Sequence, residues 1–157
     1  MARIYSEQVY LSLKAAFRRL TKAAGGQQAA ASLTRVDFQR IGRYGSPNEA
    51  MHVPIDVVAD LERDVGLPMV THELADLAGY ILIPKPPAGA DAYWVACLGE
   101  LGKEAGEAIA KLAEALNNDG RIDGDEVRRL GLRQEVREAM EVLAKIDQAL
   151  IKVEAGG

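Results

Sequence analysis

Three polar side chains, Gln39, Arg40 and Arg43, stand close together in a short stretch that is favourable for a helix. An arginine guanidinium can pair with guanine through two hydrogen bonds, and a glutamine amide can pair with adenine in the same way. Either side chain can instead hold a backbone phosphate. Asp37 directly precedes the stretch and is a good helix N-cap. We therefore predict a helix over 38–44 whose outer face reads bases; the alternative is an ordinary solvated helix face.

The residues before this helix indicate how it is positioned. Residues 27–44 read QQAAASLTRVDFQRIGRY, which predicts a short helix, a tight corner and a second helix, the order of a helix-turn-helix. Three alanines in the first helix would let a neighbouring helix approach closely. Phe38 and Ile41 are expected to point to the core. The corner at Thr34 and Arg35 lacks the glycine that often stands there at positive φ, so the register of the base-facing residues stays open.

Charge is distributed unevenly along the chain. Residues 1–52 hold eight Lys or Arg against three Asp or Glu, which is +5, and the remainder holds eleven against twenty, which is −9. A basic end joined to an acidic end favours a polyanion-binding module, although small domains also differ in charge by chance. The predicted phosphate contacts are Lys14, Arg18, Arg19, Lys22, Arg35, Tyr44 and His52.

The composition predicts an all-α protein. Apolar residues make up 48% of the chain, aromatic residues only 5%, and all six prolines fit boundaries between helices. Further helices are expected over 54–65 and over 71–82, the second with Leu74, Leu77, Ala78 and Ile81 inside. We predict a helix-turn-helix DNA-binding domain over 1–84, a Pro/Gly linker over 85–90 and a helical hairpin over 91–157.

The hairpin is predicted to make the protein oligomeric. In its first helix, over 91–118, apolar residues step by four and three from Trp94 through Leu98, Leu101, Ala105, Ala108 and Leu112 to Ala115. Its second helix, over 124–153, carries a similar stripe: Val136, Met140, Leu143, Ile146, Leu150 and Val153. Two helices bury one stripe each, so the exposed remainder is expected to pair with the same hairpin of another chain, as a dimer or a higher oligomer. The acidic side chains of both helices are expected to lie on solvated faces.

The turn of the hairpin resembles a calcium loop. Residues 115–126, ALNNDGRIDGDE, match several ligand positions, but Ala115 stands where the first ligand is normally Asp. The favoured interpretation is a turn at Asp119-Gly120 and a capping box between Asp123 and Glu126.

Other classes of function have little support in the residues. The sequence has no phosphate-cradling glycine loop, no nucleophile paired with a base and no cluster of metal ligands, so we predict no enzyme, no cofactor, no metal site and no small-molecule substrate. The single cysteine, Cys97, suits a reducing cytoplasm and is expected to be a buried structural thiol. No apolar run approaches the ~20 residues that span a bilayer.

The stretch SPNEAMHVPIDVVADLERDVGLPMVTHELADLAGYILIP carries a family resemblance. An Asn/Pro-containing loop, a His, an acidic helix ending at Gly, a helix rich in Leu and Ala and a helical tail with an Asp-Gly turn resemble the phage regulatory protein CII family, from about Ala29 to the C-terminus. The resemblance implies a sequence-specific DNA-binding regulator of phage or prophage genes, similar to a repressor or lysogeny switch protein. Together with the hairpin, it makes double-stranded DNA and a second copy of the chain the expected partners, in the host cytoplasm at the nucleoid. The alternative is a helical protein-interaction module without significant DNA affinity.

Overall fold

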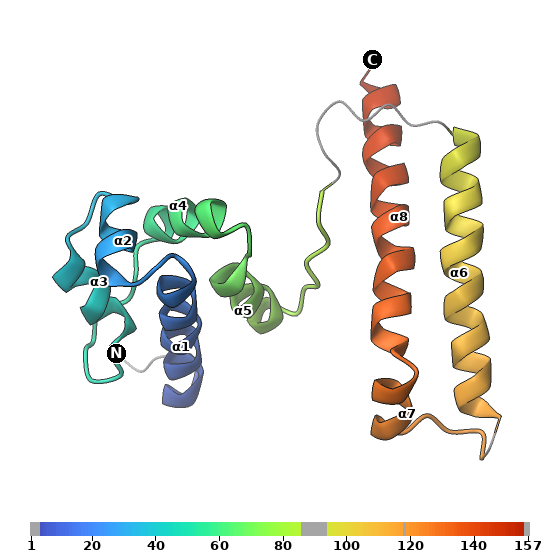
Figure 1. The fold of residues 1–157 in the computed structure, drawn as a ribbon, viewed down its shortest axis with the longest axis horizontal. Helices are drawn as coiled ribbons and strands as arrows, with labels where there is room; N and C mark the ends of the chain where they lie inside the picture. Colours follow the sequence, from blue (N-terminus) through green and yellow to red (C-terminus); the bar gives the residue numbers. More distant parts are fainter. Residues whose placement is uncertain (1–3, 86–93, 118, 156–157) are drawn as a thin grey trace. The chain divides into compact units, whose positions relative to one another are not determined.

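The structure is a computed structural model that describes residues 4–85, 94–117 and 119–155. Eight helices and no strands occur in this described part, which confirms the all-α prediction (Figure 1). The chain divides into two compact units, Met1–Leu82 and Ile83–Gly157. Of the predicted linker, only Lys85 is described. None of the described helices is both long enough and apolar enough to cross a membrane.

The N-terminal unit consists of five helices in which α1 contacts the other four. They are α1 (Glu7–Ala23), α2 (Gln27–Ser32), α3 (Phe38–Gly45), α4 (Ile55–Val65) and α5 (Met69–Ala78). Phe17 of α1 is almost completely buried and meets Tyr44 of α3 edge to face, with ring centroids 6.2 Å apart. Leu20, Ile41 and Leu61 complete the centre of this core. The burial of each such side chain contributes roughly 1.5–3 kcal/mol before the cost of ordering.

Glycines in the left-handed conformation end two of the helices. Gly66 (φ 73°) ends α4, as the sequence predicts, and Gly79 (φ 78°) ends α5. The helix predicted over 71–82 runs instead from Met69 to Ala78, so the prediction is wrong at both ends. It begins earlier because the Glu62 carboxylate accepts the N–H groups of Val70 and Thr71, at 2.6 and 2.9 Å.

The end of α5 also corrects the predicted burial of its apolar residues. Ile81 lies beyond Gly79 and is 66% exposed, and Leu74 within the helix is 44% exposed. Ala78 is also exposed, whereas Leu77 is half-buried. The core is instead closed on this side by Val70, at the start of α5.

The C-terminal unit is a hairpin of two long helices. It comprises α6 (Trp94–Leu116), the short α7 (Gly124–Arg129) and α8 (Leu132–Glu154). The predicted second helix is broken into α7 and α8 at Gly131, whose φ is 64°. Asp123 accepts the N–H groups of Asp125 and Glu126, and Glu126 accepts the N–H of Asp123, so the predicted capping box is confirmed.

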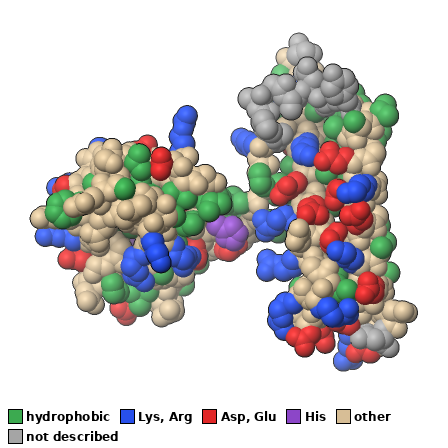
Figure 2. Space-filling model, viewed as in Figure 1, with side chains coloured by type: hydrophobic (Ala, Val, Ile, Leu, Met, Phe, Trp, Pro, Cys, Tyr) green, Lys and Arg blue, Asp and Glu red, His purple; other side chains and the backbone are tan. Residues whose placement is uncertain are grey.

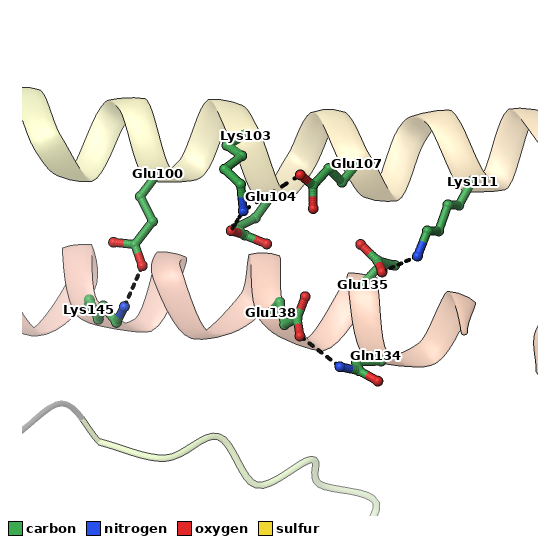
Figure 3. Close-up of polar contacts among 9 residues, drawn as sticks. All are labelled: Glu100, Lys103, Glu104, Glu107, Lys111, Gln134, Glu135, Glu138 and Lys145. Carbon is green, nitrogen blue, oxygen red and sulfur yellow. Dashed lines mark hydrogen bonds and ion pairs between the residues drawn. The ribbon is translucent and has the colours of Figure 1, made fainter. Parts of the chain in front are cut away.

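Charged side chains join α6 to α8, contrary to the expectation that they lie on solvated faces. Lys145 contacts Glu100 at 2.7 Å, and Lys111 pairs with the buried Glu135 (Figure 3). The hydrogen bond with Glu135 raises the pKa of Lys111, and the one with Glu100 raises the pKa of Lys145. The contact between the two helices therefore combines these charged pairs with the buried Ala108, Ala115, Leu132 and Val142.

Candidate nucleic-acid interface

The corner between α2 and α3 is longer than that of a minimal helix-turn-helix. Five residues, 33–37, separate the two helices, and among the described residues only glycines have positive φ. Thr34 Oγ1 donates to the carbonyl of Ala30 at 2.9 Å and so extends the end of α2. The additional length lets the chain turn without a glycine.

The N-terminus of α3 is capped as predicted. The Asp37 carboxylate accepts the backbone N–H of Arg40 at 2.9 Å, and this hydrogen bond lowers the pKa of Asp37. The Arg40 guanidinium also lies 3.7 Å from the same carboxylate. The cap fixes where the helix begins, and therefore which of its side chains face outward.

One face of α3 is buried and the other is exposed. Ile41 and Tyr44 are 1% and 5% exposed, whereas Gln39, Arg40 and Arg43 are all exposed. The prediction that Phe38 points to the core is wrong, because that side chain is 48% exposed. Val36, which lies before the cap, occupies the core in its place, so Phe38 joins the outer face beside Gln39.

Two glycines within α3 permit close approach from the preceding helices. A Cβ added at Gly42 would lie 3.1 Å from the side-chain oxygen of Gln27, and one added at Gly45 would lie 2.8 Å from Cγ of Arg18. Arg18 also donates from Nη1 to the carbonyl of Gly45 at 2.7 Å. The Gln27 amide therefore lies directly against α3, a contact that the sequence analysis did not predict. The glycine inside this short polar helix was the available signal.

A hollow of about 360 Å³ opens beside this contact. Arg18 and Lys22 of α1, Gln27 of α2 and Ser46 after α3 contribute its polar lining. Several Lys and Arg side chains lie together on the visible face of the N-terminal unit, with a few acidic side chains around them, whereas both signs of charge alternate over the hairpin (Figure 2). Basic and hydrogen-bonding side chains thus border the exposed face of α3.

The family model for phage regulatory protein CII (CP76) matches residues 43–152. The chain belongs to the phage regulatory protein CII family. No curated protein and no solved structure matches it. The family match begins at Arg43, near the end of α3, rather than at about Ala29 as expected, so α1, α2 and most of α3 lie before it.

In this CII-family protein two of the predicted phosphate contacts are buried. Lys14 is 4% exposed, and its ammonium donates to the carbonyls of Tyr44 and Met51, which ties α1 to the connection after α3. The Tyr44 ring packs on Phe17. Both predictions are corrected, because these buried side chains support α3 from behind and are not exposed to hold a phosphate.

The remaining predicted phosphate contacts divide between α3 and other surfaces. Arg18 and Lys22 lie beside α3, whereas Arg19 pairs with Glu73 of α5 at 2.9 Å. Arg35 is paired with Asp56 through two hydrogen bonds of 2.5 and 3.1 Å, which lower the pKa of Asp56. His52 is half-buried and lies edge to face with Tyr10, with ring centroids 5.7 Å apart.

Proposed function

We propose that this protein is a sequence-specific DNA-binding regulator of phage or prophage transcription, which acts in the cytoplasm of the bacterial host. Gln39, Arg40 and Arg43 contact base edges, and Arg18 and Lys22 contact the backbone. The observation that carries the proposal is the two-sided α3: Ile41 and Tyr44 anchor it in the core while the polar residues face outward. A helix held in this way presents its outer side chains in fixed positions to a major groove.

Selection of bound duplexes from a random pool, with the purified full-length protein, tests this proposal. A preferred sequence is expected, and Gln39→Ala or Arg43→Ala should relax it more than Lys22→Ala does, by about 1–3 kcal/mol of discrimination. Lys22→Ala should instead weaken binding to all sequences alike. Absence of binding to random duplex at low salt and micromolar protein would favour the protein-interaction module.

The second part of the proposal is that the regulator binds DNA as a homodimer or higher oligomer through its hairpin. The hairpin of one chain buries little apolar volume: Ala108, Ala115, Leu132 and Val142. Several large apolar side chains are at least 40% exposed, and they leave on the order of 1,000 Å² in water, comparable with the ~800 Å² that each partner of a stable interface buries. They are Trp94, Val95, Leu98, Ile109, Leu116, Val136, Leu143, Leu150, Ile151 and Val153.

Apart from Val153, which lies near the end of α8 on the side of the buried Val142, these exposed side chains share one face of the hairpin. On α6, Ile109 directly follows the buried Ala108, and on α8, Leu143 directly follows the buried Val142. One residue is a rotation of about 100° around a helix, so each exposed stripe lies to the same rotational side of the covered one. Because α6 and α8 are antiparallel, the same rotational sense places both stripes on one face.

An apolar face of this kind is self-complementary, so the same face of a second copy can cover it around a twofold axis. The half-buried Leu101, Leu112 and Met140 border this face. A dimer would present two copies of α3 and read two half-sites, which raises affinity without new contacts per chain. Light scattering should give at least twice the chain mass of 16.9 kDa. A monomer at tens of micromolar would contradict this part of the proposal.

A further inference from the structure

The side chain of Gln27 in α2 fills the space beside Gly42 of α3, where any other residue would place its own side chain. Gly42 is partly buried and lies on the flank of α3, between the buried Ile41 and the exposed Gln39 and Arg43. A Cβ at that position would lie 3.1–3.2 Å from three atoms of the Gln27 amide group. Gln27 therefore takes the place of a side chain at position 42, and its amide becomes part of the surface that α3 presents.

The side chains that line the hollow beside Gln27 are of the kinds that bind an anion. Lys22 and Arg18 supply positive charge, the Gln27 amide supplies N–H donors and Ser46 supplies a hydroxyl. Among the described residues that line the hollow, none is acidic. The Arg18 guanidinium is held in place by its 2.7 Å hydrogen bond to the Gly45 carbonyl. This combination of fixed charge and neutral donors is the one that proteins use against DNA phosphate.

We infer that this hollow holds a backbone phosphate of duplex DNA, with Lys22 supplying charge and the Gln27 amide donating a hydrogen bond. The inference rests on the proposed function and deepens it. A phosphate at this place lies against the flank of α3, so it sets how the helix is oriented and how deeply it enters the groove. Gln27 is thus a positioning residue that touches the backbone and reads no base.

Gln28 provides a matched control for Gln27. It has the same side chain on the same helix, is exposed and does not line the hollow. In anisotropy titrations of the full-length protein against several duplexes, Gln27→Ala should weaken binding about tenfold to each of them, as expected for one hydrogen bond to a charged group. Gln28→Ala should leave the affinity unchanged. Gly42→Ala should reproduce the Gln27→Ala effect, since it displaces the amide, and circular dichroism should show an intact fold.

A second pair of variants tests the charge in the hollow. Lys22→Gln should reduce the slope of log affinity against log salt by about 0.9, the value for one lost phosphate contact. Arg19 lies one turn before Lys22 on α1 and pairs with Glu73, so Arg19→Gln should change the slope less.

The outcomes separate this inference from the proposed function. If the unmodified protein binds DNA while Gln27→Ala equals Gln28→Ala and Lys22→Gln keeps the slope, the phosphate assignment is overturned and the proposed function stands. If Gln27→Ala changes the preferred sequence rather than the affinity for every duplex, Gln27 reads a base and the assignment is again overturned. If the unmodified protein binds no duplex, the proposed function fails first.

Discussion

The two units of this protein are stabilised by different means. The N-terminal unit surrounds Phe17 with Leu20, Ile41, Val57 and Leu61, all of them almost fully buried. Among its described residues, the hairpin buries two alanines, one leucine and one valine as apolar side chains, and it adds ion pairs between its helices. The first unit has a core of its own, whereas the second leaves most of its apolar stripe available to another molecule. The difference supports the proposal that the hairpin is the unit through which the protein associates.

The ion pairs of the hairpin do not replace a core. The side chains of Glu100 and Lys145 are 42% and 43% exposed, so water screens much of their attraction. Glu135 is more buried, and removal of its partner Lys111 would leave a charge in a poor environment. Such pairs favour one register of α6 against α8 more than they add stability. In the proposed oligomer, burial of the apolar face would contribute more stability than these pairs do.

The largest expected effect is in the core of the N-terminal unit. Phe17→Ala should lower the free energy of unfolding of that unit by about 3–5 kcal/mol, because it leaves a cavity at the centre. The only tryptophan, Trp94, lies in the hairpin, so its fluorescence follows the hairpin while circular dichroism follows both units. Urea titrations should show an early transition by circular dichroism with little change in fluorescence. Ile55→Ala, at a side chain that is 81% exposed, should shift the transition by less than about 0.5 kcal/mol.

A charge on the apolar face should dissociate the oligomer. Ile109→Glu places a carboxylate in the centre of the expected interface, where desolvation without a partner is costly. Ala110→Glu introduces the same group one residue later, turned by about 100° away from the stripe. Light scattering should show monomer for the first variant and the unmodified mass for the second. Equal masses for both variants would mean that this face is not the interface.

A smaller effect is expected at the turn of the hairpin. Asp123→Ala removes both capping hydrogen bonds at the start of α7 and should cost about 1 kcal/mol, measured by thermal unfolding. Asp125→Ala is the control, since that exposed carboxylate only pairs with Arg128. The Asp123 and Glu126 carboxylates are engaged in the capping box, so titration calorimetry with millimolar calcium should give no saturable heat.

The smallest effect concerns the pair that joins the α2–α3 corner to α4. The hydrogen bond from Arg35 lowers the pKa of Asp56 below its usual 3.8. A carboxylate with a lowered pKa stabilises the fold above the unfolded value, and this contribution is lost as the pH falls through the folded value. Below about pH 3.8 the unmodified protein should therefore lose stability more steeply than Asp56→Asn, as followed by urea titrations across the acid range. Asp60→Asn should keep the steep dependence.

Features that depend on neighbouring residues were predictable from the sequence. The caps at Asp37 and Asp123 and the helix end at Gly66 each involve hydrogen bonds or backbone angles within a few residues. The all-α class follows from composition and spacing. The apolar stripes of the hairpin were also predictable. The sequence did not show which of their residues become buried between α6 and α8 and which stay exposed.

Only the tertiary structure decided which side chains are buried and which lie together. Lys14 can be buried because its ammonium donates hydrogen bonds to the carbonyls of Tyr44 and Met51, thirty or more residues away. Phe38 is 48% exposed, whereas Val36, two residues earlier, is buried in the core. Gln27 lies on α3 because Gly42 leaves room for it. The sequence determines each local element through short-range hydrogen bonds and backbone preferences. The surface that those elements share depends on how distant residues fill the same space.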